Sequence, residues 1–212
     1  HKRAYDGDLG PNTGGMGSYS PAPVFTPELV EAADRLVVQP VVAAMAAEGM
    51  PYRGVLYAGL MATGDGPKVV EFNARFGDPE CQVLMMRLKS DLLPILYASA
   101  TGTLDQVSAE WSEDPALTVV LASKGYPSAY EKATPIVALP AAGDGAKVFH
   151  AGTTIKDGQL VATGGRVLNA TARGATVGQA QASAYTLVDA VQWENGFCRR
   201  DIGWQAIARE KS

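Results

Sequence analysis

The chain has 212 residues, 47% of them hydrophobic, and a formal net charge of −4 at pH 7. This length and apolar content suffice for a buried core in one large or two small domains, while the acidic balance lacks the basic surface that nucleic-acid binding needs. No apolar run is long enough to cross a bilayer, so we expect neither a nucleic acid nor a membrane as a partner. Cys81 and Cys198 each lack a C-x-x-C partner, which favours a reduced, cytoplasmic setting over a disulfide or zinc site.

The first 23 residues are predicted to form a glycine-rich loop with little apolar content. Glycine permits backbone conformations and close ligand approach that other residues resist, and successive backbone N–H groups in such a loop can form a concave anion site. Two aspartates, two positions apart, are candidates to hold a substrate amine or to orient a metal-bound group, and the asparagine and threonine that follow suit a phosphate or a ribose. The candidate binding residues are Asp6, Asp8, Asn12, Thr13, Gly14 and Gly15. An ordinary surface loop is the alternative.

A helix and a hairpin are predicted after this loop. Thr26 suits the N-cap of the helix, apolar residues recur at helical spacing as far as Gly49, and Pro40 is expected to kink or interrupt it. Residues 52–61 and 68–72 are rich in strand-forming residues and flank a turn. This pattern indicates a β-hairpin.

The second strand of the hairpin runs into the sequence VEFNARFGDPE at residues 70–80. Glu71 and Asn73 are two positions apart, so their side chains share one face of an extended strand. A carboxylate and an amide oxygen are hard ligands that suit Mg²⁺. Arg75, the next residue on that face, carries a planar guanidinium suited to a phosphate or a carboxylate. Polar residues at a solvent-exposed strand end are the alternative explanation.

Helices come first among the elements predicted after the hairpin, and strands follow them. Asp78 is expected to cap a helix that starts at Pro79, and Asp91 and Gly102 are expected to bound the next helix. A polar, acidic stretch at residues 103–115 indicates a domain boundary or a linker. The remaining predicted strands are residues 117–123, 146–150, 153–156, 159–163 and 166–172, and the remaining helices are residues 176–191 and 201–208. Asp157 and Gly158 are expected to form a hairpin turn of the favoured type between two of these strands.

Two long motifs carry a family resemblance. HKR and DGDLGPNTGGMG at residues 1–3 and 6–17, with VEFNARFGDPE at residues 70–80, closely resemble the glycinamide ribonucleotide synthetase (phosphoribosylamine-glycine ligase) family of ATP-grasp enzymes. The resemblance implies an α/β (α+β) fold, in which the C-terminal half of an ATP-grasp core, with an antiparallel sheet and helices, precedes a small C-terminal α+β domain. We place the core at residues 1–109 and the small β-rich domain at residues 110–212.

The resemblance also implies a reaction. ATP phosphorylates the carboxylate of glycine, and the amine of 5-phosphoribosylamine then attacks the acyl phosphate to give glycinamide ribonucleotide, in de novo purine biosynthesis. Mg²⁺ or Mn²⁺ is then held by Glu71 and Asn73. Arg75 serves as the catalytic residue that steadies the acyl phosphate, and the glycine-rich loop borders the amine-substrate pocket.

The resemblance further implies a missing part. The upstream domain and the ATP-binding lid of the family are not in this sequence, so we expect a fragment with little or no activity alone, from a cytoplasmic monomer. Its implied partners are glycine, 5-phosphoribosylamine, ATP and the N-terminal half of the same polypeptide. Arg166 and Gly165 are further candidate substrate contacts, whereas the lone His150 favours a structural role. The alternatives are an ATP-grasp ligase with a different amine substrate and a noncatalytic ATP-grasp-like module.

Overall fold

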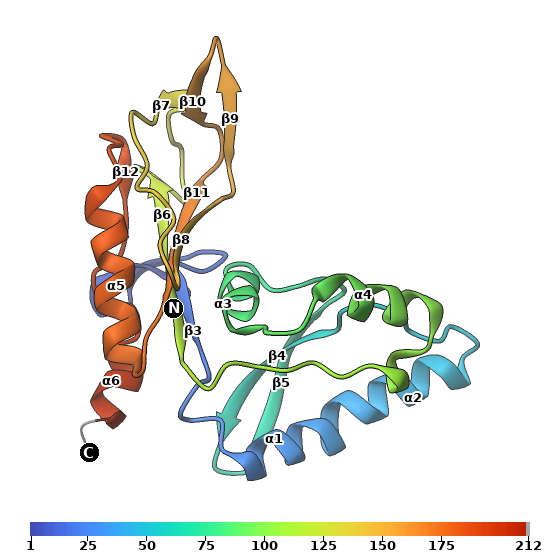
Figure 1. Cartoon of the computed structure of the whole chain (residues 1–212). Helices are drawn as coiled ribbons and strands as arrows, with labels where there is room; N and C mark the ends of the chain where they lie inside the picture. Colours follow the sequence, from blue (N-terminus) through green and yellow to red (C-terminus); the bar gives the residue numbers. More distant parts are fainter. Residues whose placement is uncertain (211–212) are drawn as a thin grey trace. The chain divides into compact units, whose positions relative to one another are not determined.

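The structure is a computed structural model that describes residues 1–210 (Figure 1). It divides into two compact units, each built from separate stretches of the chain. The first unit combines His1–Pro21 and Asp78–Arg87 with residues 112–210, and the second combines Ala22–Gly77 with Leu88–Trp111. The α/β (α+β) class with antiparallel sheets is confirmed.

The first unit is organised around β6 (Ala116–Ser123), a strand whose eight residues are all buried. One edge of β6 pairs with β11 (Arg166–Arg173), which in turn pairs with β8 (Ala146–His150). The other edge pairs with β3 (Gly17–Ser20) near the start of β6 and with β12 (Gly196–Phe197) near its end. All of these pairings are antiparallel. A strand that is buried throughout its length is apolar on both faces because both are covered.

Helices cover this sheet. Helix α5 (Val177–Ala190), capped by the Thr176 hydroxyl, packs on β6, β8 and β11 and contacts α6 (Trp204–Glu210). Helix α3 (Glu80–Arg87) packs on the sheet from the other side (Figure 1). The main hydrophobic core includes Leu117, Val119, Leu168, Ala170, Val177 and Ile202.

A second sheet of the same unit contains β7 (Thr134–Pro135), β10 (Gln159–Ala162) and β9 (Thr153–Lys156) in that order. The turn between β9 and β10 places Asp157 and Gly158 at positive φ. Two consecutive residues with positive φ form the turn that best matches the twist of a two-residue hairpin. The predicted Asp-Gly hairpin is therefore confirmed.

Thr134→Val is expected to destabilise the first unit by about 1–3 kcal/mol, because the substitution leaves a buried donor without an acceptor. The indole N–H of Trp193 donates to Thr134 Oγ1 at 3.0 Å, and both residues are buried. Chemical unfolding of the full-length protein measures the loss. The matched control is Thr186→Val on the exposed side of α5, which we expect to change stability by less than about 0.5 kcal/mol. Equal effects of the two variants would contradict the prediction.

The second unit begins with one interrupted helix. Helix α1 (Pro27–Ala33) is capped by Thr26 Oγ1, continues as a π-helical turn at Asp34–Val38, and resumes as α2 (Gln39–Ala47). In the π turn, the Gln39 N–H donates to the carbonyl oxygen of Asp34, five residues earlier. The residue after Gln39 is a proline, which has no N–H to donate, so the helix widens where the sequence predicts an interruption.

A hairpin and a further helix complete the second unit. Strands β4 (Tyr57–Thr63) and β5 (Gly66–Asn73) pair antiparallel, which confirms the predicted hairpin. Helix α4 (Leu92–Thr101) is capped by Asp91 and ends at Gly102, whose φ of 76° is left-handed. Both ends of this helix are as predicted.

The prediction of a loop over residues 1–23 is wrong in part. The segment holds β1 (Arg3–Tyr5) and β2 (Leu9–Asn12), which pair with each other, and β3, which pairs with β6. For β3, pairing with a strand about a hundred residues away overrides the loop propensity of the glycine-rich sequence. Helix α3 also starts one residue later than predicted, at Glu80.

The expected division at residues 109 and 110 stays a prediction. One passage between the two units does fall close to it, between Trp111 and Ser112. The stretches His1–Pro21 and Asp78–Arg87, however, cluster with the C-terminal half of the chain. None of the helices within residues 1–210 has the length and apolar character needed to cross a membrane.

Candidate functional site

The end of β5 carries the predicted metal ligands. Glu71 and Asn73 lie on the same face of β5, opposite Gly59 and Tyr57 of β4. A Cβ atom on Gly59 would lie 3.0 Å from Cγ of Glu71. The missing side chain at position 59 therefore leaves space for the Glu71 side chain across the hairpin.

Arg75 lies next to this pair. Its Nη1 donates to the Phe76 carbonyl oxygen at 2.7 Å, and its Nη2 is 3.5 Å from Oδ1 of Asn73. The side chain is exposed, so its remaining N–H groups face solvent. The structure thus brings the three predicted residues Glu71, Asn73 and Arg75 together at one end of the hairpin.

The donor set is suited to a divalent cation shared with a phosphate. Residues 1–210 contain no cluster of three or more His, Cys, Asp or Glu side chains able to hold a metal, so a metal at Glu71 and Asn73 needs oxygens from elsewhere. Mg²⁺ fits this situation because it commonly binds one or two protein oxygens and completes its shell with water and substrate phosphates.

The glycine-rich loop lies in the first unit. Thr13 Oγ1 donates to the Lys2 carbonyl oxygen at 2.9 Å and accepts from the Gly15 N–H at 3.0 Å. The Gly14 N–H donates to the Tyr126 hydroxyl at 3.1 Å. These bonds shape the loop internally, and Tyr126 is a contributor that the sequence analysis missed. Asn12, by contrast, is exposed and lies opposite Arg3 in the β1–β2 ladder.

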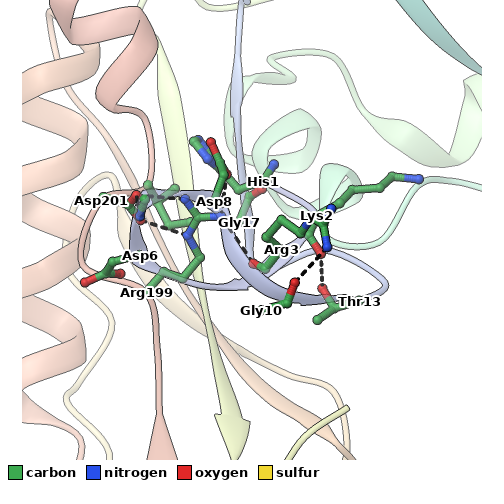
Figure 2. A network of polar contacts seen from close by, with 12 residues as sticks. His1, Lys2, Arg3, Asp6, Asp8, Gly10, Thr13, Gly17, Arg199 and Asp201 are labelled. Carbon is green, nitrogen blue, oxygen red and sulfur yellow. Dashed lines mark hydrogen bonds and ion pairs between the residues drawn. The ribbon is translucent and has the colours of Figure 1, made fainter.

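The two candidate aspartates of this loop contact the C-terminal segment 199–201, and Figure 2 shows the contact made by Asp8. Asp6 Oδ1 accepts from the backbone N–H of Arg200 at 2.7 Å, and Asp8 Oδ1 accepts from Arg199 Nη1 at 2.8 Å. Both aspartates are exposed at the loop surface. Each therefore makes a structural bond to a segment that is distant in the sequence.

Arg199 is the centre of this network, and the sequence analysis did not single it out. Its Nε and Nη2 each donate to the carboxylate of Asp201 at 2.8 Å, and its side chain is 0% exposed. Burial alone would lower the pKa of Arg199, but its bonds to Asp201 and Asp8 hold that pKa above its usual value. Burial would likewise raise the pKa of Asp201, but Arg199 and the Gly7 N–H hold it below its usual value. The only sequence signal is the run Arg-Arg-Asp directly after Cys198.

Arg166 joins three segments of the first unit. Its guanidinium donates to Oδ2 and to the carbonyl oxygen of Asp78, at 2.9 and 2.7 Å, and to the Gly15 carbonyl oxygen at 3.3 Å. It also packs on Gly14, where a Cβ would lie 2.8 Å from the guanidinium carbon. The predicted substrate contact thus lies directly against the glycine-rich loop. The Asp78 carboxylate, expected to cap a helix, pairs with Arg166.

The other two candidates have local partners. Gly165 packs against the ring of Tyr126, which leaves no space there for a side chain. His150 Nδ1 forms a hydrogen bond with Thr153 Oγ1 at 3.0 Å and is exposed. Their roles toward a substrate stay predictions.

Two family models match the chain. The model of the phosphoribosylglycinamide synthetase ATP-grasp (A) domain matches residues 1–81, and the model of the phosphoribosylglycinamide synthetase C domain matches residues 116–205. Together they contain every candidate residue described above. Both models belong to one family.

Two curated relatives that match the whole of this chain share one name. The phosphoribosylamine–glycine ligase of Agrobacterium fabrum is 69% identical over 212 residues, which is 100% of this chain and 50% of that protein. The chloroplastic phosphoribosylamine–glycine ligase of Arabidopsis thaliana is 52% identical over 217 residues, which is 100% of this chain and 41% of that protein. The chain spans half or less of the length of these curated relatives.

Solved structures show the same fold. The phosphoribosylamine–glycine ligase of Thermotoga maritima superposes with a TM-score of 0.85 at 38% identity, covering 95% of this chain and 49% of that one. The biotin carboxylase domain of a Hydrogenobacter thermophilus carboxylase superposes with a TM-score of 0.62 at 16% identity, covering 86% of this chain and 40% of that one. The second likeness concerns the fold alone. Both agree with the predicted ATP-grasp architecture.

Proposed function

Since this chain belongs to the phosphoribosylglycinamide synthetase family, we propose that the full-length protein joins glycine to 5-phosphoribosylamine with ATP, as a step of purine biosynthesis. The observation that carries this proposal is the grouping of Glu71, Asn73 and Arg75 at one end of the β4–β5 hairpin. A metal-ligand pair beside a guanidinium suits phosphoryl transfer to a carboxylate, where positioning and charge neutralisation provide most of the catalysis.

The proposed reaction has two steps. A carboxylate oxygen of glycine attacks the γ-phosphorus of ATP and ADP leaves, which gives glycyl phosphate. The amine nitrogen of phosphoribosylamine then attacks the carbonyl carbon, phosphate leaves, and the nitrogen loses a proton. Neither step needs a covalent bond to the protein.

Residues of this chain have separate roles in that scheme. Glu71 and Asn73 would hold Mg²⁺ or Mn²⁺, which when bound neutralises charge on the ATP phosphates. The Arg75 guanidinium steadies the acyl phosphate through its solvent-facing N–H groups. The loop that contains Asp6, Asp8 and residues 12–15 forms the amine-substrate side.

The remaining parts of the site belong to the rest of the polypeptide. Because the chain spans half or less of the length of the relatives named above, we propose that the N-terminal half supplies the ATP-binding lid and that this chain alone has little or no activity. We also propose that the protein is a cytoplasmic monomer.

ADP release from Mg–ATP tests the function. The full-length protein is expected to release ADP only when both glycine and phosphoribosylamine are present, and this chain alone is expected to release little or none. Activity with another amine but not with phosphoribosylamine would favour a different ATP-grasp ligase. Failure of the full-length, folded protein to bind Mg–ATP would favour a noncatalytic module.

A further inference from the structure

We propose that Arg199 is a positioning residue, and that Asp8 serves the amine-substrate loop through Arg199 and not by touching the substrate. The inference concerns the turn Asp6–Asp8 and the strand that follows it, and it rests on the proposed function. The observations that carry the inference are the contacts of the Arg199 guanidinium (Figure 2).

The guanidinium of Arg199 is fully enclosed and fully engaged. Besides its two bonds to Asp201, its Nη1 donates to Asp8 Oδ1 at 2.8 Å and to the Arg3 carbonyl oxygen at 3.2 Å. With 0% of its side chain exposed, Arg199 has no surface with which to contact a substrate. A buried cation of this kind requires its carboxylate partners, because an unpaired charge in the interior is strongly destabilising.

The whole turn is tied to the same segment. Asp6 accepts from the Arg200 N–H, and the Gly7 N–H donates to Asp201 Oδ2 at 2.8 Å. Each residue of Asp6–Asp8 thus has a bond to one residue of the segment 199–201. The turn itself is exposed and contributes nothing to the apolar core, so polar bonds determine its shape.

The turn adopts a conformation that needs such support. Gly7 and Asp8 have φ values of 67° and 55°. Asp8 is a non-glycine residue in the left-handed region, which costs free energy and persists where surrounding contacts hold it. The ion pair with Arg199 is such a contact.

The shape of the turn determines where the substrate-side residues lie. The turn joins β1 to β2, and their register places Arg3 opposite Asn12 and Tyr5 opposite Leu9. Thr13 then bonds to the Lys2 carbonyl oxygen. Arg199 also bonds to the carbonyl oxygen of Arg3. Loss of its guanidinium would therefore loosen β1 and the turn together, and would displace Asn12 and Thr13.

A double-mutant cycle in the full-length protein tests the proposal with Asp8→Ala and Arg199→Lys. Lysine keeps the positive charge but lacks the planar guanidinium with its several N–H donors. The variant therefore does not leave the carboxylates of Asp8 and Asp201 without a cation. Each single variant is expected to raise KM for phosphoribosylamine about tenfold while kcat changes by less than about threefold, since the loop is displaced and the phosphoryl-transfer groups are intact. The double variant is expected to match the worse single variant, because both act through one contact.

Arg200→Lys is the matched control. The Arg200 side chain pairs with exposed Asp189 at 2.7 Å, and its link to Asp6 uses only the backbone N–H. This neighbouring substitution is expected to leave KM unchanged. A KM increase equal to that of Arg199→Lys would overturn the proposal.

Three other outcomes would also overturn it. Additive effects, with a rise of about a hundredfold in the double variant, would mean that Asp8 contacts the substrate independently of Arg199. A fall in kcat with unchanged KM would place these residues in the chemical step. Unchanged kinetics with a lower thermal midpoint would assign Arg199 to stability alone.

Hydrogen–deuterium exchange separates a failure of this inference from a failure of the proposed function. Without any substrate, the amides of residues 5–13 are expected to exchange about tenfold faster in Asp8→Ala and Arg199→Lys than in the wild type or Arg200→Lys. If the wild type ligates nothing but this pattern holds, the loop-positioning role stands and the reaction is wrong. If the exchange rates are equal, the inference is overturned whatever the reaction.

Discussion

Glu71→Ala in the full-length protein is expected to lower kcat for ADP formation by about 10²–10³-fold, because it removes the charged member of the proposed metal pair from the phosphoryl-transfer site. Asn73, on the same face of β5, would remain as a neutral ligand with weaker attraction for a divalent cation. Steady-state kinetics at several Mg²⁺ concentrations measure the loss. We also expect the concentration of Mg²⁺ that gives half-maximal rate to rise.

Asp65→Asn is the matched control for this experiment. It removes a carboxylate from the same hairpin, at the turn between β4 and β5, where Asp65 is exposed and its backbone N–H donates to Thr63 Oγ1 at 3.3 Å. The variant is expected to keep wild-type activity and Mg²⁺ dependence. Wild-type kinetics in folded Glu71→Ala would refute the proposed metal role.

Gly152→Ala is expected to destabilise the first unit by about 3 kcal/mol, because the added methyl group overpacks a site that cannot yield. A Cβ at this position would lie 2.6 Å from Gly164 Cα and 2.7 Å from the Arg166 carbonyl oxygen. Both neighbours are backbone atoms, and the Arg166 carbonyl oxygen also accepts a hydrogen bond from the Gly152 N–H at 3.1 Å. Thermal and urea unfolding of the full-length protein measure the change.

Gly143→Ala provides the comparison in the same unit. A Cβ there meets nothing within 4 Å, and the residue does not have positive φ. The stability of the Gly143→Ala protein is expected to be unchanged or raised by less than about 1 kcal/mol. A Gly152→Ala protein as stable as Gly143→Ala would show that the loops around Gly152 and Gly164 can separate at low cost.

Elements with strong local signals were predictable from the sequence. Thr26, Asp91 and Thr176 cap helices as their residue types indicate, and Asp157 and Gly158 form the expected hairpin turn. Each of these features depends on a few neighbouring residues. The bounds of the predicted strands therefore agree closely with β6, β8, β9, β10 and β11.

Features that depend on distant partners were not predictable in the same way. Strand β3 forms because β6 offers it an edge, and α3 begins at Glu80 while Asp78 pairs with Arg166. Neither partner lies near its target in the sequence. Local propensity cannot report such pairings, because the free energy that decides them comes from tertiary contacts.

The candidate site likewise has one part that the sequence predicts and one part that depends on tertiary contacts. The sequence by itself determined that Glu71, Asn73 and Arg75 gather at one strand end, because side chains two positions apart share a face of any extended strand. Only the tertiary structure decided what Asp8 does, because its partner Arg199 is 191 positions away. The type of a side chain states which bonds it is able to make, and the fold of the whole chain selects the partner.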